Sequence, residues 1–382
     1  MGSSIKRLPP LLLFVIACPI AAFGVDSEAS WLHVEFSPDS PVLAVSSSLG
    51  GTTARPLGTS LAVDLHASLV LRNTSSKRIS GMTLRVEAQD LTPRGKGSRT
   101  YPTLNVQPGE VFPVRIDMEL VRPLYLGKTE GSLVRVALDC VLFSDLTAYG
   151  PDKLGSRRAL MVYELEARRD RQYLADLLQT RRLAQLREEL NFGLPDFNPQ
   201  QLGLELFRDG RSNLQREQSV SVGAVSFPSS PVQPIGGAAR VFGNEVRTPE
   251  VDVKNTSKKE VRSIEMGWIV QDDHGRDFVA GAVPTALQLA PVETARMTEP
   301  GAMRFSQRTG QPMVIGGLLA FVNDVEFVDG KLWIPSRLDI VQATTDPVLR
   351  RALSNSPEQQ RLAEIYRRKG LNGLAEELRK GN

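Results

Sequence analysis

LVLRNTSSKRISGMTLRVEAQD, at residues 69–90, aligns without a gap with VDVKNTSKKEVRSIEMGWIVQD, at residues 251–272. Six of the 22 aligned positions are identical, and the central Asn-Thr-Ser is among them. In each copy a polar cluster separates two runs whose apolar residues roughly alternate, which is typical of two strands joined by a turn. A duplicated segment of this kind predicts two homologous β-domains.

The repeat continues on both sides of this block. The further matching segments are 37–42 with 227–232, 102–110 with 284–293, and 141–154 with 320–332. In the second copy Asp329-Gly330 is typical of a tight hairpin turn, because both residues tolerate positive φ. The alignment places the counterpart of this turn near Gly150-Pro151, where that signature is lost.

Each copy offers about seven short strands in roughly 120 to 135 residues, which suits two packed antiparallel sheets. With its two Asn-Thr-Ser turns and the FVDGKLW hairpin at residues 327–333, the chain resembles the immunoglobulin-like or fibronectin-type β-sandwich superfamily of bacterial exported proteins. The resemblance is architectural and implies no activity. We expect a mostly β protein with helical additions: two homologous antiparallel immunoglobulin-like β-sandwiches joined by a long helix, and a C-terminal helical hairpin.

Helices are predicted between and after the two copies. Residues 163–190 contain no Gly or Pro and are rich in Arg, Glu, Leu and Ala. Their charged side chains are expected on a solvated face, and a short helix is expected over residues 202–207. Near the C-terminus, Asp346-Pro347 and the segment 356–359 (SPEQ) are helix start signals, and Gly370 is a stop signal. The predicted domains are a signal peptide (1–24), a first sandwich (25–162), a helical linker (163–217), a second sandwich (218–345) and C-terminal helices (346–382).

The N-terminus is typical of an export signal. Two basic residues precede the apolar run LLLFVIA at residues 11–17, which is too short to span a membrane. Cleavage after Gly24 would release a soluble chain, whereas residues 15–18 (VIAC) resemble a bacterial lipobox with Cys18 as the lipidated residue. The expected location is therefore periplasmic or secreted, with anchoring through Cys18 as the alternative. The second cysteine, Cys140, lies in an apolar strand and is expected to be buried.

No catalytic or cofactor-binding motif is recognisable in the sequence. The three histidines have no second His or Cys at ligand spacing. Asp324, Glu326 and Asp329 are weak candidates for calcium ligands, although a hairpin turn and solvent-side alternation also explain them. The Asn-Thr-Ser segments match the N-glycosylation pattern, and a tight turn explains the same residues. A net charge of +3 gives no argument for a nucleic-acid partner.

Three functions are compatible with these features. The one the sequence favours is an exported, non-enzymatic scaffold or interaction protein of the cell envelope, binding another envelope protein or self-associating through its helices. The alternatives are an extracellular polysaccharide-binding protein and a hydrolase with an unrecognised site. A pocket of converging polar residues between the two sandwiches would favour the hydrolase, whereas a flat interface lacking perturbed acids would disfavour it.

Overall fold

The computed structural model describes residues 32–88, 93–123, 134–192, 201–207, 217–299, 301–307 and 313–381. The predicted signal peptide and its Cys18 lie outside the described residues. Strands account for 51% of the structure and helices for 24%, so the fold is mostly β with helical additions, as predicted.

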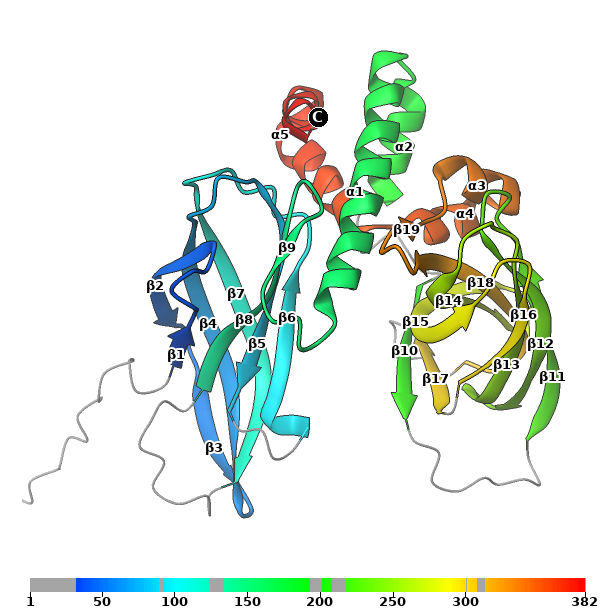
Figure 1. Cartoon of the computed structure of the whole chain (residues 1–382), viewed down its shortest axis with the longest axis horizontal. Helices are drawn as coiled ribbons and strands as arrows, with labels where there is room; N and C mark the ends of the chain where they lie inside the picture. The colour runs from blue at the N-terminus through cyan, green and yellow to red at the C-terminus, as the bar shows by residue number, and fades with distance from the viewer. Residues whose placement is uncertain are drawn as a thin grey trace, which may run out of the picture.

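The first β-domain consists of β1 to β9, which form two sheets around one core (Figure 1). One sheet has the order β1-β8-β5-β6, with β9 paired to β8. In the other sheet β4 pairs with β7 over almost its full length, and β2 and β3 pair with successive stretches of β4. The elements are β1 (Leu32–Glu35), β2 (Val42–Leu49), β3 (Thr53–Leu57), β4 (Ser60–Asn73), β5 (Ile79–Glu87), the 3-10 turn η2 (Pro93–Gly95), β6 (Lys96–Tyr101), β7 (Val111–Pro123), β8 (Val134–Phe143) and β9 (Ala148–Tyr149).

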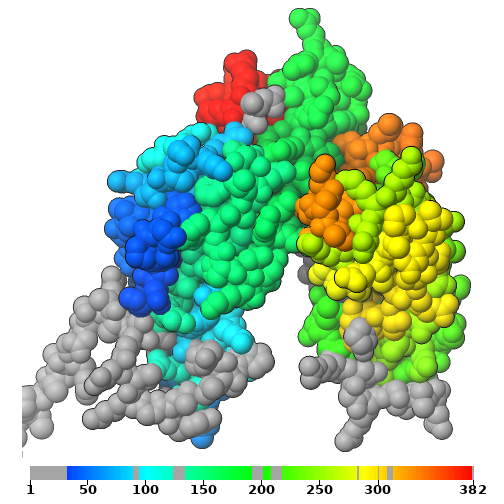
Figure 2. Space-filling view, viewed as in Figure 1, coloured from blue at the N-terminus to red at the C-terminus, as the bar shows by residue number. Residues whose placement is uncertain are grey.

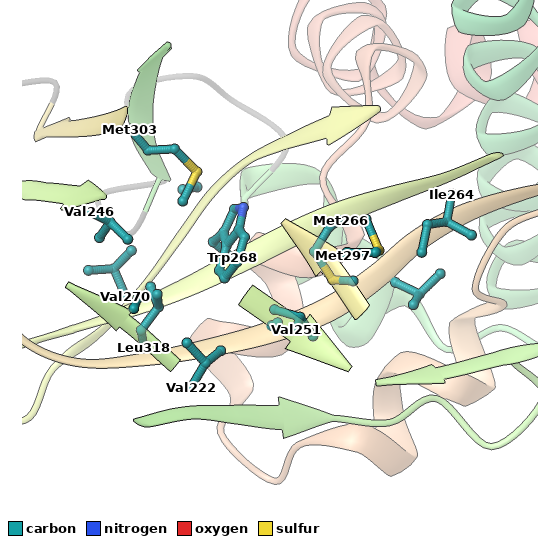
Figure 3. Packing of buried hydrophobic residues seen from close by; sticks show 14 of the residues in the cluster. Val222, Val246, Val251, Ile264, Met266, Trp268, Val270, Met297, Met303 and Leu318 are labelled. Atoms are coloured by element: carbon teal, nitrogen blue, oxygen red, sulfur yellow. The ribbon is translucent and has the colours of Figure 1, made fainter. Parts of the chain in front are cut away.

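The second β-domain has its own core and consists of β10 to β19. Its strands follow the order β11-β12-β13-β17-β10-β15-β14-β18, and a pairing of β11 with β18 joins the two ends of this series. Figure 3 shows Trp268 at the centre of the core, among Val251, Met297 and Met303. The strands are β10 (Gln201–Phe207), β11 (Gln218–Val225), β12 (Val232–Phe242), β13 (Glu245–Asn255), β14 (Val261–Asp272), β15 (Asp277–Leu289), β16 (Thr294–Thr298), β17 (Ala302–Gln307), β18 (Ile315–Phe327) and β19 (Leu332–Trp333).

The prediction of purely antiparallel sheets is wrong. β1 pairs in parallel with β8, β11 with β18, and β10 with β15. In each domain an early strand thus runs beside the last long strand in the same direction. The helix expected over residues 202–207, inside the predicted linker, is also wrong. Residues 201–207 form β10, which adds to the second β-domain between β15 and β17, and these non-local backbone hydrogen bonds override local propensity.

The long linker helix is two helices. α1 (Ser156–Gln179) starts inside the segment predicted as sandwich, and α2 (Leu183–Phe192) follows a break at Arg181, whose φ is 55°. In an unbroken helix the apolar cluster around Leu174 would lie opposite the cluster around Leu186. The break turns α2 back, so that both clusters enter one core.

The C-terminal helices are α3 (Arg337–Ala343), which lies inside the segment predicted as second sandwich, α4 (Pro347–Ser354) and α5 (Pro357–Gly381), which kinks at Gly370 as predicted. α3 and α4 pack on the second β-domain, whereas α5 packs on this chain's own linker helices. Asp346 caps α4 through the Val348 amide, as expected. α5 contributes Leu362 and Leu374 to the core that α1 and α2 form, and Figure 1 shows these three helices at one end of the molecule. No helix in the described part is long and apolar enough to cross a bilayer.

The duplication extends to individual irregularities. Between β5 and β8, Thr83 pairs with Cys140, and the next pair, Leu84 with Leu138, leaves one residue of β8 unpaired. Between β14 and β18, Glu265 pairs with Asp324, and the next pair likewise leaves one residue of β18 unpaired. A β-bulge therefore occupies the same place in both copies, with Asp139 as the extra residue of the first. This shared register allows each residue on these strands to be compared with its counterpart.

The alignment placed the counterpart of the Asp329 turn near Gly150, and this prediction is wrong. β8 and β9 reverse direction at Asp145, whose carboxylate lies 2.7 Å from Lys77, just as Asp329 lies 2.7 Å from Lys259. In both copies the lysine also lies over a phenylalanine ring, at 5.6 and 5.3 Å from its centroid. Asp329 is thus part of the repeated framework.

Candidate functional site

α1 contacts both β-domains. Near its start, the Ser156 hydroxyl donates to the Asp139 carboxylate at 2.7 Å, and Leu160 packs against Cys140 of the first β-domain. From the same turn, Arg158 donates hydrogen bonds to two carboxylates of the second β-domain, those of Glu265 (3.0 Å) and Asp324. Figure 2 shows the two β-domains meeting at the end of the molecule where α1 lies.

Three acidic side chains surround Arg158, and one of them, Glu326, also pairs with Arg262 at 3.3 Å. Besides Glu265 and Asp324, the Glu326 carboxylate lies 3.6 Å from the Nε of Arg158. Asp324 is fully buried, and its second oxygen has no hydrogen-bond partner among the described residues. Burial, with the nearby charge of Glu265, raises the pKa of Asp324 to about 8 despite the opposing charge of Arg158. Burial also raises the pKa of Glu166, on the same helix, to about 7.

The three calcium candidates are not brought together. Asp324 and Glu326 both flank the guanidinium of Arg158, which supplies the positive charge at this point. Asp329 is instead in the β18–β19 turn with Lys259. Sequence alternation predicted the shared face of Asp324 and Glu326, but the prediction that this face is solvent-side is wrong, because Asp324 is fully buried under α1. Their partner could not be predicted, because Arg158 lies 166 residues from Asp324 in the sequence.

A different acidic group has metal-compatible spacing within the described ranges. Asp272, Asp273 and His274 place their ligand atoms within 4.8 Å of one another, in the turn between β14 and β15. Asp272 already accepts hydrogen bonds from the amide of His274 (3.0 Å) and from the amide and Nε of Arg276 (both 2.8 Å). A turn closed by the side chain of Asp272 explains this cluster.

Two hollows lie where α1 meets the second β-domain. One, the junction pocket, has a volume of about 400 Å³ and includes Arg157, Arg158 and Glu326 in its lining, but not Asp324. The other, the junction groove, has a volume of about 510 Å³ and runs between α1 and the segment from β19 into α3. Its lining residues are Leu165, Arg169, Gln172, Tyr173, Asp176, Leu332, Trp333, Ile334, Pro335, Ser336, Arg337 and Leu338.

The walls of the junction groove are held in place by specific contacts. The Arg337 guanidinium lies 4.9 Å from the centroid of the Tyr173 ring, and the Trp333 indole N–H donates to the Ser229 hydroxyl at 3.3 Å. Leu338 projects into solvent beside them and is 65% exposed. Trp333 is only half-buried, because β19 is short and lies at the margin of the domain.

Beneath the groove, buried ion pairs fasten α1 to α3 and α5. Asp170 is fully buried and accepts hydrogen bonds from Arg169 and Arg337, both at 2.9 Å, and from Ser356. Burial alone would raise the pKa of Asp170, but the charges of the two arginines hold it below its usual range. A second buried pair joins Arg171 to Glu358 at 3.1 Å.

The expectation of a solvated charged face on this helix is therefore wrong for these residues. Sequence reasoning missed them because a charged residue in a helix normally faces solvent. The only signal was that Asp170 and Arg171 lie in the same helical turn as the apolar residues that form the core.

The remaining sequence predictions concern buried groups. Cys140 is buried as predicted, and burial raises the pKa of its thiol to about 12, so it is not a reactive thiolate at neutral pH. Asn73 and Asn255 are fully buried, and each carboxamide donates to a backbone carbonyl four residues on at 2.8 Å. These residues build the turn, and a glycan on either nitrogen would not fit in the folded domain.

The chain matches no protein-family model and no curated protein. Among solved structures, it is similar at 10% identity to β-glucosidase from Kluyveromyces marxianus, over 70% of this chain and 45% of that one, with a TM-score of 0.15. It is similar at 10% identity to the CBM32 and M60 catalytic domains of ZmpB from Clostridium perfringens, over 88% of this chain and 40% of that one, with a TM-score of 0.11. The chain thus spans less than half the length of either structure, and at TM-scores this low neither likeness identifies a fold or a function for this chain.

Proposed function

We propose that this chain is an exported, non-enzymatic scaffold or interaction protein of the cell envelope. It is built from two homologous β-domains, of which the first has the two packed sheets of an immunoglobulin-like β-sandwich. Two features support the architecture: each β-domain has one core, and the two copies agree in the Asn-Thr-Ser turn, the β-bulge and the Lys-Asp turn. The N-terminal sequence supports export, either with release after Gly24 or with anchoring through Cys18.

The observation that carries the interaction function is the junction groove. Tyr173, Trp333 and Leu338 give it a partly exposed apolar lining, and aromatic residues in a preformed hollow are typical anchors of protein interfaces. The ion pairs around Asp170 fix the helices that form its walls, so binding would cost little ordering. The partner is a polypeptide that inserts apolar side chains between α1 and α3.

The hydrolase alternative has one observation in its favour. The junction pocket holds polar residues, and Asp324 next to it has a pKa of about 8, which suits a general acid. A general acid must reach the substrate, however, and Asp324 is fully buried behind Arg158 and does not line the pocket. The raised pKa is explained by the seating of α1 on the domain, so the scaffold is better supported.

Site-specific photo-crosslinking in cells tests the interaction function. A photoreactive residue at Leu338 is expected to form one discrete adduct, which is lost when Tyr173→Ala removes the opposite wall. The matched control is Leu43, an equally bulky leucine that is 53% exposed on β2, far from the groove in sequence and fold. Adducts of equal yield at both positions, or none at Leu338, would contradict the proposal. An adduct of twice the chain mass would identify self-association as the interaction.

A further inference from the structure

One outer sheet face differs between the two β-domains in its polarity and in whether helices cover it. In the second β-domain, the outer face of β11, β18 and β14 is apolar and covered by helices: Phe227, Ile269 and Phe321 pack against Ile340 of α3 and Leu349 of α4. The Phe227 and Phe321 rings meet edge to face at 5.9 Å between centroids. This face is closed to any ligand.

The shared register identifies the corresponding face of the first β-domain, on β1, β8 and β5. The correspondences are Glu35 for Val225, Ser37 for Phe227, Arg85 for Gly267, Glu87 for Ile269, Arg135 for Leu319, Ala137 for Phe321 and Tyr149 for Trp333. Four of the six apolar positions thus have a polar or charged counterpart, and where the large Phe321 ring stands in one copy the small Ala137 stands in the other.

The result is a hollow of about 480 Å³, which we call the sheet-face pocket. Arg85, Arg135 and Ala137 belong to its floor, and Phe36 and Tyr149 supply aromatic walls. This volume lies within the range of about 300–1,000 Å³ that is typical of small-molecule sites.

The charges around this pocket compensate one another. Arg85 donates to Glu87 at 2.8 Å, and Arg135 bridges Glu87 at 2.7 Å and Glu35 at 3.3 Å. Lys153 adds a third cation and Asp139 a third carboxylate, which lies 3.6 Å from the Arg85 Nε. Since the cations are already faced by carboxylates, an anionic ligand would gain little from entering.

The same pairs leave donors and acceptors within reach of a ligand. The Arg135 side chain is 49% exposed and the Glu35 side chain is 56% exposed. Each arginine is a planar group of five donors, and each carboxylate accepts several hydrogen bonds. A ligand suited to this pocket must therefore be uncharged, rich in groups that both donate and accept, and partly apolar where it meets Tyr149.

We propose that the sheet-face pocket binds a neutral saccharide unit. Its hydroxyls accept from Arg85 and Arg135 and donate to Glu35, while the apolar face of the sugar ring lies against Tyr149. This site is separate from the junction groove, so either can exist without the other. It would add glycan binding to the function of the protein.

Saturation-transfer difference NMR on the mature chain, residues 25–382, tests this inference. The probes are glucose, galactose, mannose, N-acetylglucosamine and the disaccharides cellobiose and chitobiose, with inorganic phosphate followed by phosphorus NMR. At least one sugar is expected to receive saturation, and Arg135→Ala and Tyr149→Ala are expected to weaken its binding about tenfold or more.

The matched control is Arg304→Ala. Like Arg135, Arg304 lies on a strand and bridges two glutamates, Glu245 at 2.8 Å and Glu205 at 3.4 Å, but it belongs to the second β-domain. Its loss should therefore perturb folding as much as the loss of Arg135 and leave sugar binding unchanged. The proposal would be overturned by any of three results: no saturation transfer to any sugar, an equal loss of sugar binding in the Arg304 and Arg135 variants, or binding of phosphate alone. Circular dichroism of each variant shows that loss of binding is not loss of fold.

Discussion

At the scale of single residues, the turn asparagines explain why the repeat is strongest at Asn-Thr-Ser. Asn255 donates to the carbonyls of Lys259, Leu289 and Ala290 and accepts from the Ser257 amide, so one side chain ties three chain segments together. Because this polar group is fully buried, its partners would be left unsatisfied without it. The sequence predicted the turn but could not show that its asparagine is a core residue.

Asn255→Ala is therefore expected to destabilise the second β-domain by about 2–4 kcal/mol, because several buried carbonyls lose their donor. Urea denaturation followed by Trp268 fluorescence measures this effect. The control, Lys258→Ala in the same turn, removes an exposed side chain and should change the free energy of unfolding by less than about 0.5 kcal/mol. Equal midpoints for the two variants would show that the buried hydrogen bonds contribute nothing measurable.

Asp324 makes stability depend on pH. Its folded pKa of about 8 lies above its ordinary value of 3.8, so between these values the folded chain keeps a proton that the unfolded chain has lost. The folded state then binds more protons, and the free energy of unfolding falls as pH rises through this window. Asp324→Asn, which cannot titrate, should flatten the decline between about pH 5 and pH 8.

Glu166, with a pKa of about 7, titrates in the same window and leaves a residual slope that Glu166→Gln should reduce further. The measurement is the urea midpoint as a function of pH for the protein and both variants. Asp329→Asn is the control, since the pKa of this exposed carboxylate lies below its usual range. A slope that is unchanged by Asp324→Asn would contradict the assignment.

At the scale of elements, local signals predicted helix ends better than helix breaks. Asp346 and Gly370 act through their own backbone, so their sequence was sufficient. The break at Arg181 has no Gly or Pro; it forms because α1 and α2 bury opposite faces in one core with α5. β10 was missed for a related reason, since its neighbours β15 and β17 are 70 residues or more further along the chain.

α5 is held by the core that it shares with α1 and α2, and the substitution Leu374→Ala tests this contact. Leu374 is fully buried, so its loss is expected to cost about 2–4 kcal/mol of helical packing and to expose α5 to proteases. Limited proteolysis with mass spectrometry should detect faster cleavage within residues 357–381. In contrast, Arg367→Ala, on the exposed side of the same helix, should be cleaved at the rate of the unchanged protein. Equal cleavage rates would mean that α5 is not docked through this core.

At the scale of the whole molecule, α1 fixes one β-domain against the other. The repeat predicted two related domains, but their arrangement depends on contacts of residues whose chemistry differs between the two copies. The clearest case is Arg158, which meets Asp324 where the first copy has Cys140 against Leu160. At these corresponding positions, α1 contacts the first β-domain through an apolar side chain and the second through a charged one.

The most direct test of a rigid scaffold is an electron spin-resonance distance measurement between the two β-domains. Spin labels are placed at Leu43 and Ile235, which are 53% and 58% exposed. A single narrow distance distribution is expected for the protein and for the control Arg157→Ala. A broad distribution is expected for Arg158→Ala, which removes the cation of Glu265 and the hydrogen-bond donor of the buried Asp324. A broad distribution in the unchanged protein, or a narrow one in Arg158→Ala, would contradict the account.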